Sequence, residues 1–102
     1  GMNITPREVE LVIEEQPEVM HAFVMGVPHA ERGEDVAAAI VFRPGQSAPV
    51  EEMQARIKQA ISTYKVPRHI ATYESPADLP WLESGKGDRR ALQQSLIDRF
   101  GD

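Results

Sequence analysis

The chain contains no cysteine, which excludes a disulfide framework and a thiolate metal site. No apolar run approaches the roughly 20 residues that a helix needs to cross a bilayer, so no membrane insertion is expected. Basic residues are also in the minority, because 11 Lys and Arg stand against 16 Asp and Glu, for a net charge of -5. A nucleic-acid binder needs a clustered basic face to neutralise phosphates, so this charge balance argues against nucleic acid as a partner.

What the chain does contain is ordinary for a globular protein, with 41% hydrophobic and 26% charged residues over 102 positions. This length predicts one domain, residues 1–102, that folds alone. The absence of cysteine and of a signal-peptide pattern favours a cytoplasmic location. Gly1 before Met2 is interpreted as the remnant of a cleaved tag.

The segment "TPREVELVIEEQP" predicts the first helix. Thr5 suits the N-cap, Pro6 suits the first helical position, and Glu8 is placed to close a capping box. Three apolar residues recur on one face at helical spacing: Val9, Val12 and Ile13. Three acidic residues are expected on the solvent side: Glu10, Glu14 and Glu15. Pro17 ends the run.

Two strand-like runs follow, "VMHAFVMGV" from Val19 and "DVAAAIVF" ending at Phe42, joined by "PHAERGE". They predict a hairpin with a long loop. Both runs are almost continuously apolar, which indicates strands covered on both faces, or covered on one face and screened by a partner on the other. Helices are therefore expected to pack on this sheet.

A second amphipathic helix is predicted after "RPGQSAP", with its end near "YKVP" because Pro67 prevents continuation. Its apolar stripe consists of Met53, Ile57, Ala60, Ile61 and Tyr64. "HIATYE" predicts a short third strand, and "SPADLPWLESGKG" predicts an irregular loop. Asp88 is placed to cap a last helix. The buried stripe of that helix consists of Leu92, Leu96 and Phe100. The expected fold class is α+β: a small three-stranded, mainly antiparallel sheet with about three helices in a single domain.

The sequence offers few patterns with catalytic chemistry. The three histidines, His21, His29 and His69, fall on different elements without the spacing of metal ligands, so no metal site is predicted. The pattern Gly-x-Ser-x-Gly is absent, and so is a cysteine nucleophile, which leaves hydrolase chemistry without support.

The segment "SGKGD" invites comparison with a phosphate-binding P-loop. The comparison fails, because Pro80 stands in place of the first glycine and Gly87 in place of the hydroxyl residue that binds magnesium. What remains is Lys86 between Gly85 and Gly87, whose backbone freedom allows the ammonium group to project from the surface. Taken alone, the segment fits either an exposed turn or a lysine that acts in a site formed with another domain or protein.

Four segments in order, "ITPREVELVIEEQPEV", "GVPHAERGEDVAAAIVFRPG", "YKVPRHI" and "LPWLESGKGDRRAL", resemble the C-terminal domain of the adenylate-forming enzymes. This family includes acyl-CoA synthetases, peptide-synthetase adenylation domains and luciferases. The resemblance runs from Ile4 to about Leu96. It implies a two-step ligase: ATP, with Mg, and a carboxylic acid give an acyl-adenylate, and a thiol such as coenzyme A then displaces AMP.

The resemblance also implies roles for particular residues. A large N-terminal domain would hold most of the nucleotide and acid site, and this domain would be a rotating lid that inserts Lys86, next to Gly85, against the carboxylate and the nucleotide. After rotation, Arg32 and Gly33 would lie near the thiol tunnel. Three further residues would contact coenzyme A: Lys58, Tyr64 and Lys65. The alternatives are a solvated hairpin turn for the first pair and ordinary helix-end charges for Lys58 and Lys65.

Two departures from the family pattern stand out. Trp81, Leu82 and Glu83 occupy a stretch in which family members often have a basic residue and then threonine. The family's hinge and the glycine-rich strand after it are expected before Asn3, outside this chain. The first hypothesis is therefore the lid domain of an acyl-CoA synthetase, inactive alone. The alternatives are part of a peptide-synthetase adenylation domain that serves a carrier protein, and a non-catalytic binding module of the same fold.

Overall fold

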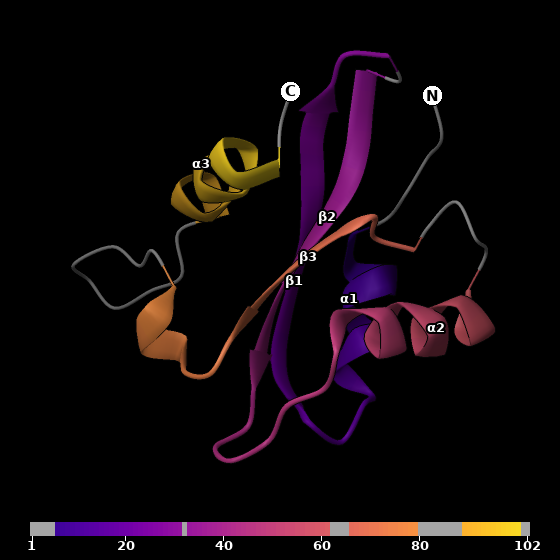
Figure 1. Ribbon diagram of the computed structural model, residues 1–102, viewed down its shortest axis with the longest axis vertical. Helices are drawn as coiled ribbons and strands as arrows, with labels where there is room; N and C mark the ends of the chain where they lie inside the picture. Colours follow the sequence, from indigo (N-terminus) through magenta and orange to yellow (C-terminus); the bar gives the residue numbers. More distant parts are fainter. Residues whose placement is uncertain (1–5, 32, 62–65, 80–88, 101–102) are drawn as a thin grey trace.

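A computed structural model describes residues 6–31, 33–61, 66–79 and 89–100. Its elements follow in the order α1 (Pro6–Glu14), β1 (Val19–His29), β2 (Gly33–Phe42), α2 (Val50–Ala60), β3 (His69–Tyr73), the short 3-10 helix η2 (Pro76–Asp78) and α3 (Arg89–Phe100). The strands form one sheet with β2 in the centre (Figure 1). This single small domain, with three α-helices and one three-stranded sheet in its described part, confirms the predicted α+β fold class.

The sheet is mixed. β1 and β2 pair antiparallel from Val19 opposite Phe42 to His29 opposite Gly33. β3 pairs with β2 in parallel over a shorter stretch, from His69 beside Ala37 onward. The predicted long hairpin loop was wrong, because backbone pairing continues to His29 and Gly33 and leaves only a short turn between the strands.

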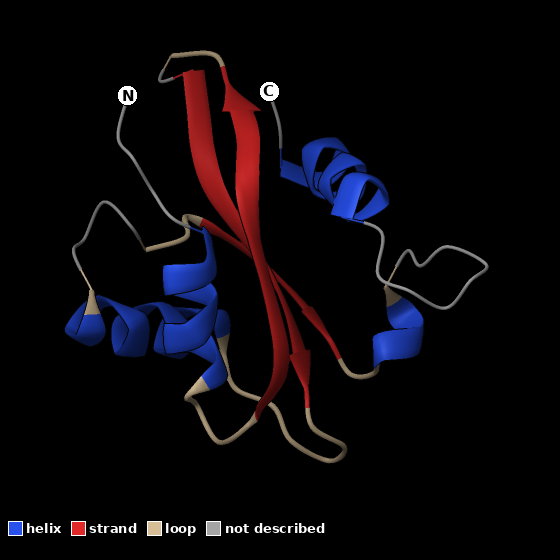
Figure 2. Cartoon of the chain, turned by 180° about the vertical axis from the view of Figure 1, so that it is seen from behind, coloured by secondary structure: helices blue, strands red, loops and turns tan. Residues whose placement is uncertain are grey.

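Helices cover both faces of the sheet, which is the first of the two arrangements that the apolar strands predicted. α1 and α2 lie on one face and α3 on the other (Figure 2). The first core contains Val9, Ile13, Val19, Ala22, Val24, Ala38, Ile40, Phe42, Met53, Ile57 and Ile70. The second contains Met25, Val27, Ala37, Ala39, Val41, Ala71, Leu79, Leu92 and Leu96. Alternate residues of one strand thus serve opposite cores, as the two-residue period of a strand requires.

The α2 stripe was predicted only in part. Met53 and Ile57 are fully buried, and Ile61 is partly buried against the first core. Ala60 is exposed, because α2 ends there and Ile61 already has extended backbone angles. Tyr64, like the two expected caps, lies outside the described residues. None of the described helices is long and apolar enough to span a membrane.

The α3 stripe was predicted correctly. Leu92 and Leu96 are buried in the second core, and Phe100 is partly buried against it. Exposed Gln94 and Asp98 lie on the opposite side of the helix.

The expectation that the acidic residues of α1 all face solvent was wrong. Glu10 is only 3% exposed, and its Oε2 accepts the Val24 N–H at 2.8 Å. Glu14, partly buried, accepts the Ala22 N–H at 3.2 Å. β1 is an edge strand, and these carboxylates occupy the place of a neighbouring strand's carbonyl groups. Arg7 pairs with both glutamates, at 3.2 and 3.3 Å.

Candidate functional site

The structure describes only part of the set of candidate residues drawn from the sequence. Gly33 and Lys58 are described. The others lie outside the described residues: Arg32, Tyr64, Lys65, Gly85 and Lys86.

Gly33 is the first residue of β2 and closes the β1–β2 turn, residues 29–33. Its φ is +81°, in the left-handed region that side chains rarely adopt. A Cβ at this position would meet no atom within 4 Å, so the backbone angle and not crowding favours glycine here. The turn lies at one end of the long hairpin and protrudes from the rest of the molecule (Figure 1).

Lys58 is exposed in the last turn of α2. One turn earlier, Gln54 Nε2 donates to the carbonyl oxygens of Pro67 and Arg68, at 3.1 and 3.3 Å. This fixes α2 to the segment that leads into β3, on the side of the helix where Lys58 follows four residues later. The structure does not bring Lys58 and Gly33 together, because α2 lies well away from the β1–β2 turn along the long axis (Figures 1 and 2).

The described residues on either side of the "SGKGD" segment are held against the α3 face of the sheet. Before it, Leu79 is buried in the second core. After it, α3 begins at Arg89, and Gln93 Nε2 donates to the Gly26 carbonyl at 3.0 Å. Both anchors therefore belong to the same side of the domain.

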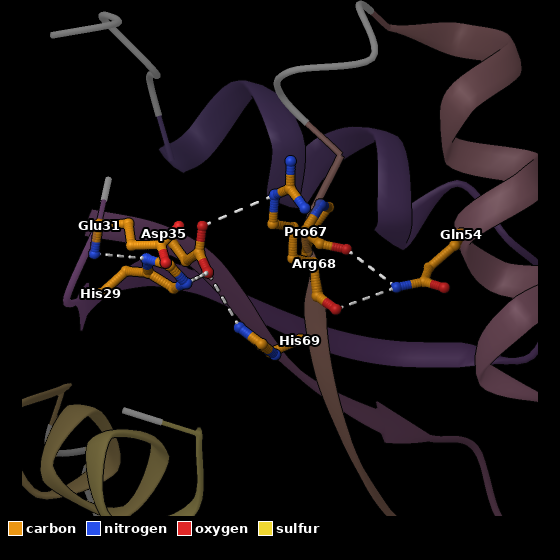
Figure 3. Close-up of polar contacts among 7 residues, drawn as sticks. All are labelled: His29, Glu31, Asp35, Gln54, Pro67, Arg68 and His69. Carbon is orange, nitrogen blue, oxygen red and sulfur yellow. Dashed lines mark hydrogen bonds and ion pairs between the residues drawn. The ribbon is translucent and has the colours of Figure 1, made fainter. Parts of the chain in front are cut away.

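A polar cluster that the sequence analysis missed surrounds Asp35, whose side chain is almost fully buried (Figure 3). Oδ2 lies 3.2 Å from His69 Nε2 and 4.0 Å from His29 Nε2. Oδ1 lies 3.6 Å from Arg68 Nε. The His69 ring stacks on Phe100 of α3, with ring centroids 5.0 Å apart. We call His29, Asp35, Arg68 and His69 the Asp35 cluster.

The strand pairing brings this cluster together. Asp35 is two residues before Ala37, the β2 residue beside which β3 begins with His69. His29 is the last residue of β1 and lies at the same end of the hairpin as Asp35. Residues 35 and 37 share a face of β2, because side chains of a strand alternate between its faces. This two-residue period could have placed Asp35 near His69 only if the pairing of β2 with β3 were known, and that long-range pairing cannot be deduced from the local sequence. Within the described part of the chain, no group of three or more His, Cys, Asp or Glu could hold a metal ion.

A second hydrogen bond links the Asp35 cluster to the turn. The Glu31 N–H donates to Nδ1 of His29 at 3.1 Å (Figure 3). His29 therefore stands between a buried carboxylate on one side and the backbone of the turn on the other.

Comparison with known proteins identifies the family. The family model "AMP-binding enzyme C-terminal domain" matches residues 8–86. The chain is 36% identical over 100 residues to the putative acyl-CoA synthetase YngI of Bacillus subtilis. The aligned region covers 98% of this chain and 18% of that protein.

Solved structures agree. Apo MatB from Rhodopseudomonas palustris matches with a TM-score of 0.84 and 29% identity, over 98% of this chain and 19% of that one. The amide bond synthetase McbA from Marinactinospora thermotolerans matches with a TM-score of 0.76 and 32% identity, over 98% and 19%. The chain thus spans less than a fifth of the length of these relatives. It belongs to the family of AMP-binding enzyme C-terminal domains.

Proposed function

We propose that this chain is the lid domain of an ATP-dependent carboxylate–CoA ligase. The observation that carries the proposal is the similarity to a protein named an acyl-CoA synthetase over 98% of this chain. The whole of residues 1–102 would form one domain, and its partner would be a large N-terminal domain that holds the acid and most of the nucleotide. In the reaction, a carboxylate oxygen attacks the α-phosphorus of ATP, pyrophosphate leaves, and the thiol of coenzyme A then attacks the acyl carbon and releases AMP.

Lys86 is the residue to which we assign the first step. The attacking carboxylate and the phosphates are all anionic, and they repel one another as they approach. A positioned ammonium group lowers that repulsion and stabilises the charge of the transition state by about 3 kcal/mol in a site closed to water. Gly85 would let the backbone come close to the nucleotide.

The second step would use other parts of the domain. The β1–β2 turn, with Arg32 and Gly33, would border the thiol tunnel, and the positive φ of Gly33 is a backbone angle that a residue with a side chain would adopt only under strain. Lys58 would contact coenzyme A together with Tyr64 and Lys65, and its exposure on α2 is compatible with binding an anionic ligand. Magnesium would arrive with ATP, as the family resemblance implies.

The test separates the two steps in the full-length protein that carries this domain. Lys86→Ala should slow pyrophosphate exchange, a measure of adenylation, by at least about a hundredfold, the equivalent of about 3 kcal/mol. CoA-dependent AMP release from a supplied acyl-adenylate should change only modestly. Lys58→Ala, which removes an equal charge elsewhere, should show the reverse pattern. Equal losses in both steps for Lys86→Ala would refute its assignment.

A second acceptor class has a specific observation in its favour. McbA, which matches over 98% of this chain, is named an amide bond synthetase, so an adenylate on this enzyme could pass to an amine instead of a thiol. The same assay distinguishes the two, because AMP release from the acyl-adenylate should then depend on an added amine and not on coenzyme A.

A further inference from the structure

The outer edge of β1 is a place where the sheet could accept another strand. β1 has a neighbouring strand on one side only, because the order in the sheet is β1-β2-β3. With 11 residues it is also the longest of the described strands. A long edge strand presents a row of backbone N–H and C=O groups that can pair with a strand of another molecule.

The pairing with β2 determines which residues of β1 face this edge. In an antiparallel pair, alternate residues direct both backbone groups toward the partner strand, and the residues between them direct both away. The register with β2 is regular from His21 to His29. Within this stretch, the N–H groups of Ala22 and Val24 donate to side chains of α1, which identifies both as outward residues. By the same alternation, residues 26 and 28 also face outward.

α1 closes the first half of this edge. Oε2 of Glu14 accepts the Ala22 N–H at 3.2 Å, and Oε2 of Glu10 accepts the Val24 N–H at 2.8 Å. Glu10 is only 3% exposed, and Arg7 pairs with both glutamates, so the two carboxylates are held beside the strand. A strand that paired here would have to displace two charge-assisted hydrogen bonds, which are stronger than the neutral bonds that it could form.

The second half of the edge is closed by α3 and by the strand itself. Nε2 of Gln93 donates to the Gly26 carbonyl oxygen at 3.0 Å. Pro28, the next outward residue of β1, has no N–H to give to a neighbouring strand. α1 and α3 lie on opposite faces of the sheet, so side chains from both faces reach the same strand edge (Figure 2). At each of the four outward residues, one backbone group that an added strand would use is therefore occupied or missing.

We propose that these side chains of α1 and α3 close β1 against strand addition, and that the partner they exclude is a second copy of this chain. Two copies could pair β1 with β1 in antiparallel fashion about a two-fold axis, which would join their sheets at identical edges. This pairing competes with Glu10, Glu14 and Gln93 for the same backbone groups. The proposal concerns the domain alone and does not depend on the ligase function proposed above.

The test opens the edge by substitution in this chain. Glu10→Ala/Glu14→Ala removes both acceptors and leaves room for a strand beside β1. In NMR diffusion measurements at millimolar concentration, the native chain should be monomeric and this double variant should form dimers. Glu10→Gln/Glu14→Gln keeps two oxygen acceptors and should be monomeric. Glu15→Ala/Glu51→Ala is the matched control, because it removes the same charge from exposed positions away from the edge, and it should be monomeric as well.

Amide hydrogen exchange shows which surface the dimer uses. In micromolar Glu10→Ala/Glu14→Ala, the Ala22 and Val24 amides should exchange at least about tenfold faster than in the native chain, the effect of losing a hydrogen bond to a charged group. At millimolar concentration the same two amides should regain protection, because β1 of the second copy then accepts them. The amides of β3, at the other edge of the sheet, should gain no protection with concentration.

A Glu10→Ala/Glu14→Ala variant that stays monomeric, or whose dimer leaves the Ala22 and Val24 amides unprotected, would overturn the proposal. Dimers of the native chain, of the glutamine variant or of the matched control at the same concentration would overturn it as well. If the loss of Glu10 prevents folding, Glu14→Ala/Gln93→Ala decides the matter, because it opens the edge on both faces and keeps the buried Glu10. Dimers of that variant with a protected Ala22 amide would support the proposal, and monomers would refute it.

Discussion

The bond between Glu10 and Val24 offers the sharpest test of how this fold is held together. Substituting Glu10 with Leu removes the acceptor of the Val24 N–H and the partner of Arg7, while it keeps an apolar stem of similar length. Glu10→Gln keeps an amide oxygen that can still accept the bond but loses the charge. Comparing the two variants therefore separates the effect of the hydrogen-bond acceptor from the effect of its charge.

The structure sets the expected magnitudes. The bond is 2.8 Å long, buried, and accepted by a charged group, a class worth about 1.5–3 kcal/mol. Arg7 is 59% exposed, so its ion pair with Glu10 adds less than about 1 kcal/mol. Glu10→Leu should therefore lower the free energy of unfolding by about 2 kcal/mol, and Glu10→Gln by about 1 kcal/mol. For a domain of this size, 2 kcal/mol corresponds to a Tm lower by about 10 °C.

Urea unfolding followed by circular dichroism measures these differences, with Glu15→Gln as the control. Glu15 is exposed directly after the same helix, so its substitution should change stability by less than about 0.5 kcal/mol. If Glu10→Leu is as stable as Glu15→Gln, the carboxylate does not stabilise the edge strand β1, and the role given to α1 is wrong.

Two further predictions concern stability. Glu18 accepts hydrogen bonds from its own backbone amide and from Arg56, which hold the pKa of its carboxyl below the usual value. A lowered pKa in the folded state gives stability that is present above the ordinary range of the carboxyl and is lost as the pH falls through the folded value. The advantage of the native chain over Glu18→Gln in urea unfolding should therefore be largest near neutral pH and shrink in acid, and a constant difference would contradict this. Leu96→Ala, in the second core, should cost about 3 kcal/mol in the same assay, whereas exposed Gln94→Ala should cost less than about 0.5 kcal/mol; similar costs would show that α3 is not held by this side chain.

The sequence predicted the fold class because its strongest signals are local. The two-sided burial of the strands followed from runs such as "DVAAAIVF", and the stripe of α3 followed from helical spacing. The burial of Glu10 did not follow. Amphipathic spacing assigns an acidic residue to solvent unless a buried donor needs it, and the donor here, the Val24 N–H, is 14 residues away in the chain on the edge strand β1.

The Asp35 cluster was missed for a related reason. His29 and His69 are 40 residues apart, and they converge on one carboxylate only because β3 pairs with β2 in parallel and begins beside Ala37. The local pattern of "HIATYE" predicts neither the direction of β3 relative to β2 nor the register of their pairing. Of the candidate site itself, Gly33 stays a prediction supported by its backbone angle, and the assignments of Lys86 and Arg32 stay predictions on residues outside the described part.

The placement of β2 bears on how one small domain could serve two chemical steps. Its residues from Ala37 to Val41 are fully buried between the two cores, and it is paired on both edges, so little freedom is left within the sheet. The β1–β2 turn lies at one end of the long axis, while η2, which precedes the "SGKGD" segment, lies well away from that end (Figures 1 and 2). Because the sheet is rigid and the β1–β2 turn and η2 lie far apart on it, bending of the sheet cannot bring both regions to one small site. If both act on the same acyl group, the rotation that the family resemblance implies is compatible with this sheet, because a rigid-body turn about a hinge outside the core needs no bending within it.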